Sequence, residues 1–150
     1  MKKHRQHVRV ALLVALGLVA VVAAVRPSKA SIGNVNKADL AGAWQMTTIG
    51  QTGCGFGTTL YTFTLNGSGV ASNVVATSHT AGCGDSTSTG ATFQIQALNG
   101  NGSGTAGLGC GTGCGWNLNI QVAPDRSTFS LIDVSAANPG NFIEGTAIHQ

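Results

Sequence analysis

Gly109-Cys110-Gly111-Thr112-Gly113-Cys114-Gly115-Trp116 is the stretch of sequence that places a cysteine pair directly before a strand. Apolar residues then occupy every second position, at Trp116, Leu118, Ile120 and Val122. Asparagine and glutamine fill the positions between them. A period of two indicates a strand that turns one face toward a core. The stretch therefore predicts a β-strand that begins directly after a cysteine-bridged turn.

The rest of the chain repeats this pattern of short apolar runs between turn residues, which is typical of an all-β domain. Asn-Gly pairs at 66–67 and 99–100 indicate tight hairpins, because both central residues of a type I′ turn need positive φ. We expect one helical turn at 36–40, before the first strand. We expect eight strands, at residues 42–49, 58–65, 70–78, 91–98, 103–108, 116–122, 127–134 and 142–149.

The faces of two strands follow from the same alternation. In the second strand Tyr61 and Leu65 are expected to share a face with Phe63. In the fourth strand Phe93 and Ala97 are expected to share a face with Ile95.

The connections between these strands differ in length. The links after the second, fourth and sixth strands are short, whereas the links after the first, third and fifth are longer, rich in glycine and carry all four cysteines. In an up-and-down meander alternate connections lie at the same end, so one end is expected to be closed and the other to form a rim of loops. We predict an eight-stranded antiparallel β-barrel, which also removes exposed strand edges. A two-sheet β-sandwich is the alternative, because nothing in the sequence proves closure.

The N-terminal segment has the features of a signal peptide. Four basic residues precede an apolar run of fifteen residues at 11–25, and Ser28-Lys29-Ala30 places small residues around a cleavage site. The alternative is an uncleaved anchor, but the run is shorter than the ~20 residues of a membrane-spanning helix. We therefore predict a signal-peptide helix at 1–30, a single domain at 31–150 without a membrane span, and a secreted or periplasmic location.

Cleavage changes the charge of the protein. The full chain has a net charge of +3, but residues 31–150 keep only Lys37 and Arg126 against five acidic residues, a net charge of −3. Nucleic-acid binding depends on clustered lysine and arginine, so this composition excludes nucleic acid as a partner.

The even number of cysteines in an exported chain predicts disulfides. We favour the pairs Cys54–Cys83 and Cys110–Cys114, because the first two lie in neighbouring rim loops and the last two face each other across a short turn; the crossed pairings remain open. The alternative is a zinc site of four thiolates, but such sites usually combine two closely spaced pairs. We expect no metal and no cofactor.

The segment Leu40-Ala41-Gly42-Ala43-Trp44 resembles the Gly-x-Trp signature that opens the first strand of lipocalins and avidins. The layout of tight turns and open loops is similar to theirs as well. The resemblance implies that Gly42 and Trp44 belong to the closed end, and it implies a small hydrophobic ligand at the open end. The arginine that those proteins carry after the eighth strand is missing, as is their C-terminal helix, and we expect Arg126 to cover the indole ring instead.

The sequence contains no catalytic motif, so an enzymatic activity is unsupported, and we expect His79 and His149 to be surface residues. The leading hypothesis is binding of a small hydrophobic ligand or an extracellular partner at the rim, with Tyr61, Phe93 and Trp116 as lining aromatics. The alternative is a structural or surface-interaction protein whose barrel is filled by its own side chains. An interior cavity on the order of several hundred Å³ would favour binding.

Overall fold

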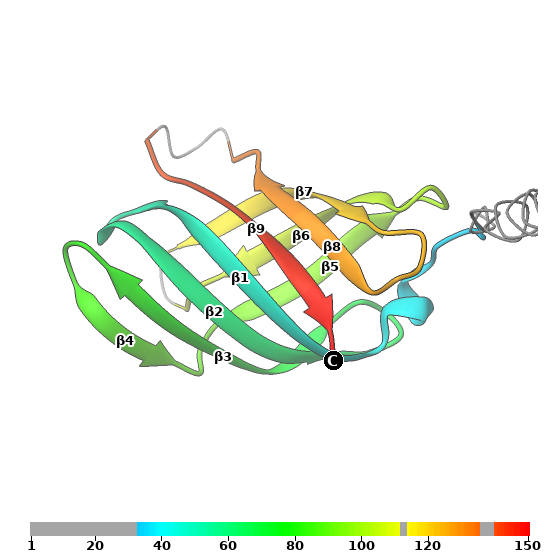
Figure 1. The fold of residues 1–150 in the computed structure, drawn as a ribbon, viewed down its shortest axis with the longest axis horizontal. Coiled ribbons are helices and arrows are strands. Elements are labelled where there is room, and N and C mark those ends of the chain that lie inside the picture. Colours follow the sequence, from blue (N-terminus) through cyan, green and yellow to red (C-terminus); the bar gives the residue numbers. More distant parts are fainter. Residues whose placement is uncertain (1–32, 112–113, 136–139) are drawn as a thin grey trace, which may run out of the picture. The chain divides into compact units, whose positions relative to one another are not determined.

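The computed structural model describes residues 33–111, 114–135 and 140–150 (Figure 1). The predicted signal peptide at 1–30 lies outside the described residues. The described residues belong to one unit, Ser31–Gln150. Within those ranges, no helix has the length and hydrophobicity that crossing a bilayer requires.

The unit is all-β, as predicted, and consists of one antiparallel sheet curled into a half-barrel (Figure 1). The elements are a 3₁₀ turn η1 (Lys37–Leu40) and the strands β1 (Gly42–Thr52), β2 (Gly55–Leu65), β3 (Ala71–Thr80), β4 (Gly84–Ser88), β5 (Thr92–Leu98), β6 (Ser103–Gly109), β7 (Gly115–Val122), β8 (Thr128–Asp133) and β9 (Phe142–His149). The strand order β4-β3-β2-β1-β9-β8-β7-β6-β5 is an up-and-down meander in which β1 pairs with β9. The single sheet differs from the alternative two-sheet sandwich.

The structure contains one strand that the sequence did not predict. β4 lies in the loop expected between the third and fourth strands, and it pairs with the end of β3. All five of its residues are polar or glycine and all are exposed, so it carries no alternation. The Ser78 and Ser86 hydroxyls, 2.8 Å apart, join the two strands.

The barrel closes at only one end. A bridge between Val70 and Gln94, together with the bond from Ile95 N–H to the Gly69 carbonyl, joins the two halves of the sheet there. Beyond that point β3 pairs with β4 along Ala76–Thr80, so its edge is not free to pair with β5. The prediction was an eight-stranded barrel; the described residues form a half-barrel of nine strands, the eight predicted ones and β4.

The core follows the predicted alternation at most positions. Four aromatic rings form its centre: Trp44 lies 5.0 Å from Phe129, which lies 5.9 Å from Phe93, which in turn lies 5.2 Å from Phe63. The expectation for Ala97 was wrong. A register shift after Ile95 turns Ala97 outward, where it is exposed, and Leu98 packs against the core instead.

A capped 3₁₀ turn covers the closed end. The Asn36 side chain accepts hydrogen bonds from the N–H groups of Ala38 and Asp39, and the Asp39 carboxylate accepts one from Asn36 N–H. This capping box positions Leu40, whose carbonyl accepts a 2.8 Å hydrogen bond from Trp44 Nε1–H. The predicted helical turn therefore anchors the indole of the Gly-x-Trp segment.

His149, rather than Arg126, covers the Trp44 ring. The two rings are stacked, with centroids 4.7 Å apart and an interplanar angle of 4°. Arg126 instead lies in the turn between β7 and β8, with its Nε 3.2 Å from Asp39 Oδ2. His149 is half-buried, so it lies at the surface as expected, but pairing of the end of β9 with β1 also places its ring opposite Trp44.

Gly42 makes room for this stack. A Cβ at residue 42 would overlap the His149 ring at Nε2, and the backbone there has a φ of +143°, which side chains rarely adopt. Because the spacing in Gly-x-Trp is two, Gly42 and the Trp44 indole lie on the same side of β1. The His149 ring occupies the space that a side chain at residue 42 would fill.

Gly42→Ala is expected to lower the free energy of unfolding by more than about 1 kcal/mol, because alanine is strained at this φ and overlaps His149. Gly53→Ala is the matched control, since a Cβ there meets no atom within 4 Å. Urea unfolding measures both. Adding His149→Ala to Gly42→Ala should restore part of the lost stability, and a purely additive loss would show that the overlap is unimportant.

The capping carboxylate predicts a loss of stability in acid. The N–H of Asn36 holds the pKa of Asp39 below its ordinary value of 3.8, Arg126 acts in the same direction, and burial opposes both. A lowered folded-state pKa gives stability that is complete above the ordinary pKa and is lost as the pH falls through the lowered value. The urea concentration at the midpoint of unfolding should therefore decrease when the pH is lowered below about 4. The fall should be smaller in Asp39→Asn, and an unchanged pH dependence would remove Asp39 from this role.

Candidate functional site

The open end of the half-barrel contains a cavity of about 520 Å³. Its wall is formed by residues of β1, β2, β3, β4, β7 and β9 and of the rim loops. This volume falls within the ~300–1,000 Å³ of typical small-molecule pockets. The side chains that line the cavity are apolar, carry hydroxyl groups or, at Asn141, carry an amide; the aliphatic hydroxyl groups belong to Thr48, Thr52, Thr59, Ser78, Thr80, Ser86 and Ser88, and Tyr61 adds a phenol.

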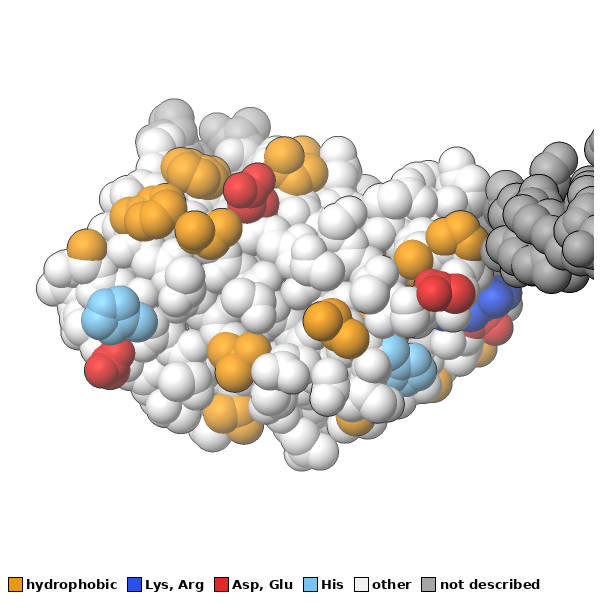
Figure 2. All heavy atoms as spheres, in the orientation of Figure 1, with side chains coloured by type: hydrophobic (Ala, Val, Ile, Leu, Met, Phe, Trp, Pro, Cys, Tyr) orange, Lys and Arg blue, Asp and Glu red, His pale blue; other side chains and the backbone are white. Residues whose placement is uncertain are grey.

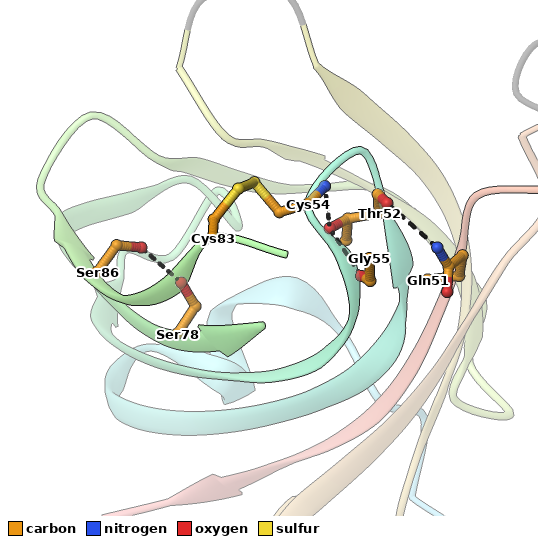
Figure 3. Close-up of a disulfide and its surroundings, with 7 residues drawn as sticks. All are labelled: Gln51, Thr52, Cys54, Gly55, Ser78, Cys83 and Ser86. Carbon is orange, nitrogen blue, oxygen red and sulfur yellow. Dashed lines mark hydrogen bonds between the residues drawn. A yellow bond between two sulfur atoms is a disulfide. The ribbon is translucent and has the colours of Figure 1, made fainter. Parts of the chain in front are cut away.

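Two disulfides stand at the rim of this cavity, and all four cysteines line it. Cys54 is joined to Cys83 across the β1–β2 and β3–β4 turns, with Cα atoms 5.3 Å apart (Figure 3). Cys110 is joined to Cys114 between β6 and β7, with Cα atoms 5.6 Å apart. The structure thus has the two favoured pairs rather than a crossed pairing.

The loop around Cys54 is held by hydrogen bonds with the Thr52 hydroxyl and with the neighbouring β3–β4 turn. Thr52 Oγ1 accepts a hydrogen bond from Cys54 N–H and donates one to the Gly55 carbonyl, each 3.2 Å long (Figure 3). Gly82 N–H donates to the Cys54 carbonyl at 2.8 Å. A Cβ on Gly82 would lie 2.7 Å from that carbonyl oxygen, so the glycine beside Cys83 allows the two turns to approach.

Two of the three predicted lining aromatics contact the cavity. Tyr61 and Trp116 line it, but Phe93 does not, because it packs deeper, between Phe63 and Phe129. Burial raises the pKa of the Tyr61 phenol above its ordinary value of 10.0, and hydrogen bonding with the Thr59 and Thr48 hydroxyls opposes that rise.

The two tryptophans differ in the state of their indole N–H groups. Trp44 Nε1 is bonded to the Leu40 carbonyl. Trp116 Nε1 is buried, and none of the residues that the structure describes accepts a hydrogen bond from it. The Trp116 side chain lines the cavity and is 9% exposed, but its Nε1 atom has no accessible surface, so the part of the ring that faces the cavity is apolar.

The cavity has no charged wall. Among the described residues, none of its lining side chains is acidic, basic or a histidine. His79 Nδ1 and Asp85 Oδ1 form a 2.6 Å pair, but both side chains are exposed, on the face of the β3–β4 hairpin opposite the cavity-lining Ser78. Residues 33–111, 114–135 and 140–150 contain no group of three His, Cys, Asp or Glu that could hold a metal ion. The arrangement is suited to non-covalent binding of an uncharged molecule.

Sequence reasoning missed the hydroxyl groups of the wall, although β1 contains a signal for them. Its inward positions are apolar at Trp44 and Met46 and then change to Thr48, Gly50 and Thr52. β2 shows the same change in the direction of the rim, where Phe63 and Tyr61 are followed by Thr59 and Gly57. The point at which the inward face changes from apolar to small and polar marks the boundary between the packed core and the cavity.

Comparison with known proteins returns no significant match, whether to a protein-family model, to a curated protein or to a solved structure.

Proposed function

We propose that this chain is an exported binding protein that holds a small, uncharged, largely apolar molecule in the cavity at its disulfide rim. The observation that carries the proposal is the cavity itself, about 520 Å³ of space lined by Tyr61, Trp116, two disulfides and uncharged hydroxyl groups. An empty interior of this size favours a binding protein over a barrel filled by its own side chains. A charged ligand is disfavoured, because none of the described lining side chains carries an opposite charge to offset its loss of water.

The family resemblance supports the same proposal. The Gly-x-Trp segment at 42–44 and the arrangement of one closed and one open end are similar to those of lipocalins and avidins. We propose that the chain is a lipocalin-like barrel in which His149 takes the place of the ring-covering arginine of those proteins. The two disulfides and the signal-peptide pattern at 1–30 support export to an oxidising compartment.

Native mass spectrometry of the protein purified from its own host tests both parts of the proposal. The polypeptide is expected to begin at Ser31, and part of the sample is expected to carry one bound small molecule that is released on unfolding. A product that retains Met1 in the membrane would contradict export. A ligand-free protein that also binds no neutral apolar probe would contradict the binding function.

Binding is expected to be independent of pH between about pH 5 and pH 9, because no charged group lines the cavity. The raised pKa of Tyr61 keeps its phenol neutral throughout that range. Fluorescence titration with a neutral, polarity-sensitive dye at several pH values measures this. A change in affinity near pH 6.5 would implicate a histidine in the site.

An apolar patch on the outer surface favours a second candidate function, that of a surface-interaction protein. The patch consists of the exposed side chains Ile49, Phe56, Ile132, Val134 and Phe142. Cross-strand pairing brings them together, since Gln51 lies opposite both Phe56 and Phe142, and Glu144 lies opposite both Ile49 and Ile132. Figure 2 shows apolar side chains gathered around an acidic side chain on this face.

Exposed apolar patches often mark protein contacts. If this patch is a contact surface, Phe56→Ser with Phe142→Ser should reduce association with the partner or with a second copy, without changing probe binding in the cavity. Sedimentation velocity and the dye titration measure the two effects separately.

A further inference from the structure

The hydroxyl groups of the cavity wall are confined to one part of the sheet. All of the aliphatic hydroxyl groups that line the cavity belong to β1–β4, which also contribute Ala76 and the Tyr61 ring. The rest of the described wall, from the loop before β5 to β9, presents the Asn141 amide and the apolar side chains Ala91, Cys110, Cys114, Trp116 and Ile143. A molecule in the cavity therefore meets hydroxyl groups on one side and mainly apolar surface on the other.

Cross-strand pairing arranges four of these hydroxyl groups in one row. Thr48 lies opposite Thr59, which lies opposite Ser78. Ser78 in turn lies opposite Ser86. Neighbouring strands are about 4.8 Å apart, so the row crosses about 14 Å of the wall. Thr48 is buried, whereas Ser78 is half-buried and Ser86 is exposed, so a ligand can reach the row at its β3–β4 end.

The Ser78–Ser86 pair retains hydrogen-bonding capacity for a ligand. The two hydroxyl oxygens are 2.8 Å apart, and the bond between them uses only one of their two protons (Figure 3). The other proton and the remaining lone pairs allow the pair both to donate to a ligand oxygen and to accept from a ligand hydroxyl. Since none of the described lining side chains is charged, the complementary ligand groups are neutral hydroxyl or carbonyl groups.

We propose that the ligand is an uncharged molecule with two different edges, one of hydrocarbon and one that carries two or more hydroxyl or carbonyl groups. Its oxygen groups lie toward Ser78 and Ser86, and its hydrocarbon edge lies toward Trp116 and Ile143. This inference rests on the proposed binding function and adds to it the ligand class and the orientation. A molecule with oxygen groups on opposite edges would bury one of them against the apolar part of the wall, without a partner to replace its water.

Two isomeric probes test this ligand class. In 2,7-dihydroxynaphthalene both hydroxyl groups lie on one long edge of the ring system, whereas in 2,6-dihydroxynaphthalene they lie on opposite edges. The isomers have the same rings and the same number of hydroxyl groups. Isothermal titration calorimetry of the wild-type protein, with both disulfides formed, is expected to show about tenfold tighter binding of the 2,7 isomer, the effect of one additional satisfied hydrogen bond.

Nuclear Overhauser effects between the bound 2,7 isomer and the protein test the orientation. The ring protons at positions 1 and 8 lie between the two hydroxyl groups, and they are expected to be close to the β-protons of Ser78 and Ser86. The protons at positions 4 and 5 lie on the opposite edge, and they are expected to be close to Ile143 and to the Trp116 ring. The reverse pattern would overturn the inference.

A pair of double variants tests the role of the hydroxyl groups. Ser78→Ala with Ser86→Ala removes both members of the pair, so neither is left without its partner, and it should abolish most of the preference for the 2,7 isomer. Thr77→Ala with Thr87→Ala is the matched control, because these residues pair on the same two strands but are exposed and lie outside the cavity wall. The control should keep the preference. Retention of the preference in the serine variant, or its loss in both variants, would contradict the inference.

The outcomes separate this inference from the function on which it rests. If neither isomer nor the neutral, polarity-sensitive dye binds the wild-type protein, the binding function fails and the inference fails with it. If the dye binds and the two isomers bind equally or not at all, the binding function stands and the inference is overturned. Tighter binding of the 2,6 isomer also overturns it. If the serine variant does not fold, the isomer preference and the Overhauser effects of the wild type decide the matter.

Discussion

Trp44→Ala is expected to lower the free energy of unfolding by about 3–5 kcal/mol, the range for truncation of a large core side chain. The indole is 1% exposed, lies 5.0 Å from Phe129, stacks on His149 and donates a hydrogen bond to the Leu40 carbonyl. Its removal would leave a void at the closed end and free the 3₁₀ turn that covers it. A domain of ordinary stability, about 5–15 kcal/mol, would lose a large part of that stability.

Trp116→Ala is the matched comparison, because it removes the same side chain from the opposite end. Trp116 lines the cavity and its indole N–H has no acceptor among the described residues, so truncation of this side chain enlarges an existing space instead of creating a new one. We expect a clearly smaller loss of stability and a larger effect on probe binding. Urea unfolding of Trp44→Ala and Trp116→Ala measures the two losses of stability. Equal, severe destabilisation would mean that Trp116 is a core residue and would favour the structural, filled-barrel reading.

The second large effect is expected on removal of the Cys54–Cys83 disulfide by the double substitution to serine. The bridge spans 29 residues of sequence. Constraint of a loop of that length in the unfolded chain corresponds to about 3.5 kcal/mol in the chain-entropy account. The bridge also holds the β1–β2 and β3–β4 turns together, so its removal should loosen β4 and the rim.

The Cys110–Cys114 bridge provides the matched control, since it spans only 4 residues. Its double substitution to serine should lower the stability by only about 2 kcal/mol on the same account. Urea unfolding compares the two variants, and mass spectrometry under non-reducing conditions should find no free thiol in the wild type. A larger loss from the short bridge would contradict the loop-length argument. Free thiols with bound zinc would contradict the disulfides themselves.

The strands could be predicted from the sequence because their signal is local. Alternation over a few residues reports which side chains share a face, and Trp116–Val122 shows it without interruption. Turn residues such as Asn99-Gly100 mark where a strand ends. The eight predicted strands are therefore present, and the links that carry the cysteines do lie together at one end. The prediction that these links are the longer ones was wrong, because β1 and β2 extend into the rim and leave only residues 53–54 between them, whereas the turns at the other end have four or five residues.

Features that depend on a partner across the sheet could not be predicted in this way. β4 has no apolar face and exists because the Cys54–Cys83 bridge and pairing with β3 hold it in place. The position of Ala97 depends on a register shift against β6, which alternation within one strand does not contain.

The candidate site shows the same division between local and tertiary information. The alternation of apolar and polar residues correctly predicted that Tyr61, Phe93 and Trp116 face the interior. It contains no information on how far along the barrel each residue lies, so only the tertiary structure distinguishes the buried Phe93 from Tyr61 and Trp116, which line the cavity.

At the closed end, too, only the tertiary structure shows which side chain covers the Trp44 indole, His149 of the last strand or Arg126 of a turn. The sequence by itself determined that Gly42 and Trp44 share a side of the first strand, because their spacing is two. The sequence did not determine which side chain would lie against Gly42 and Trp44. Pairing of β9 with β1 places His149 beside Trp44, while the turn after β7 directs Arg126 to Asp39. Contacts between residues about a hundred positions apart depend on strand register, and strand register is set by the packing of the whole sheet.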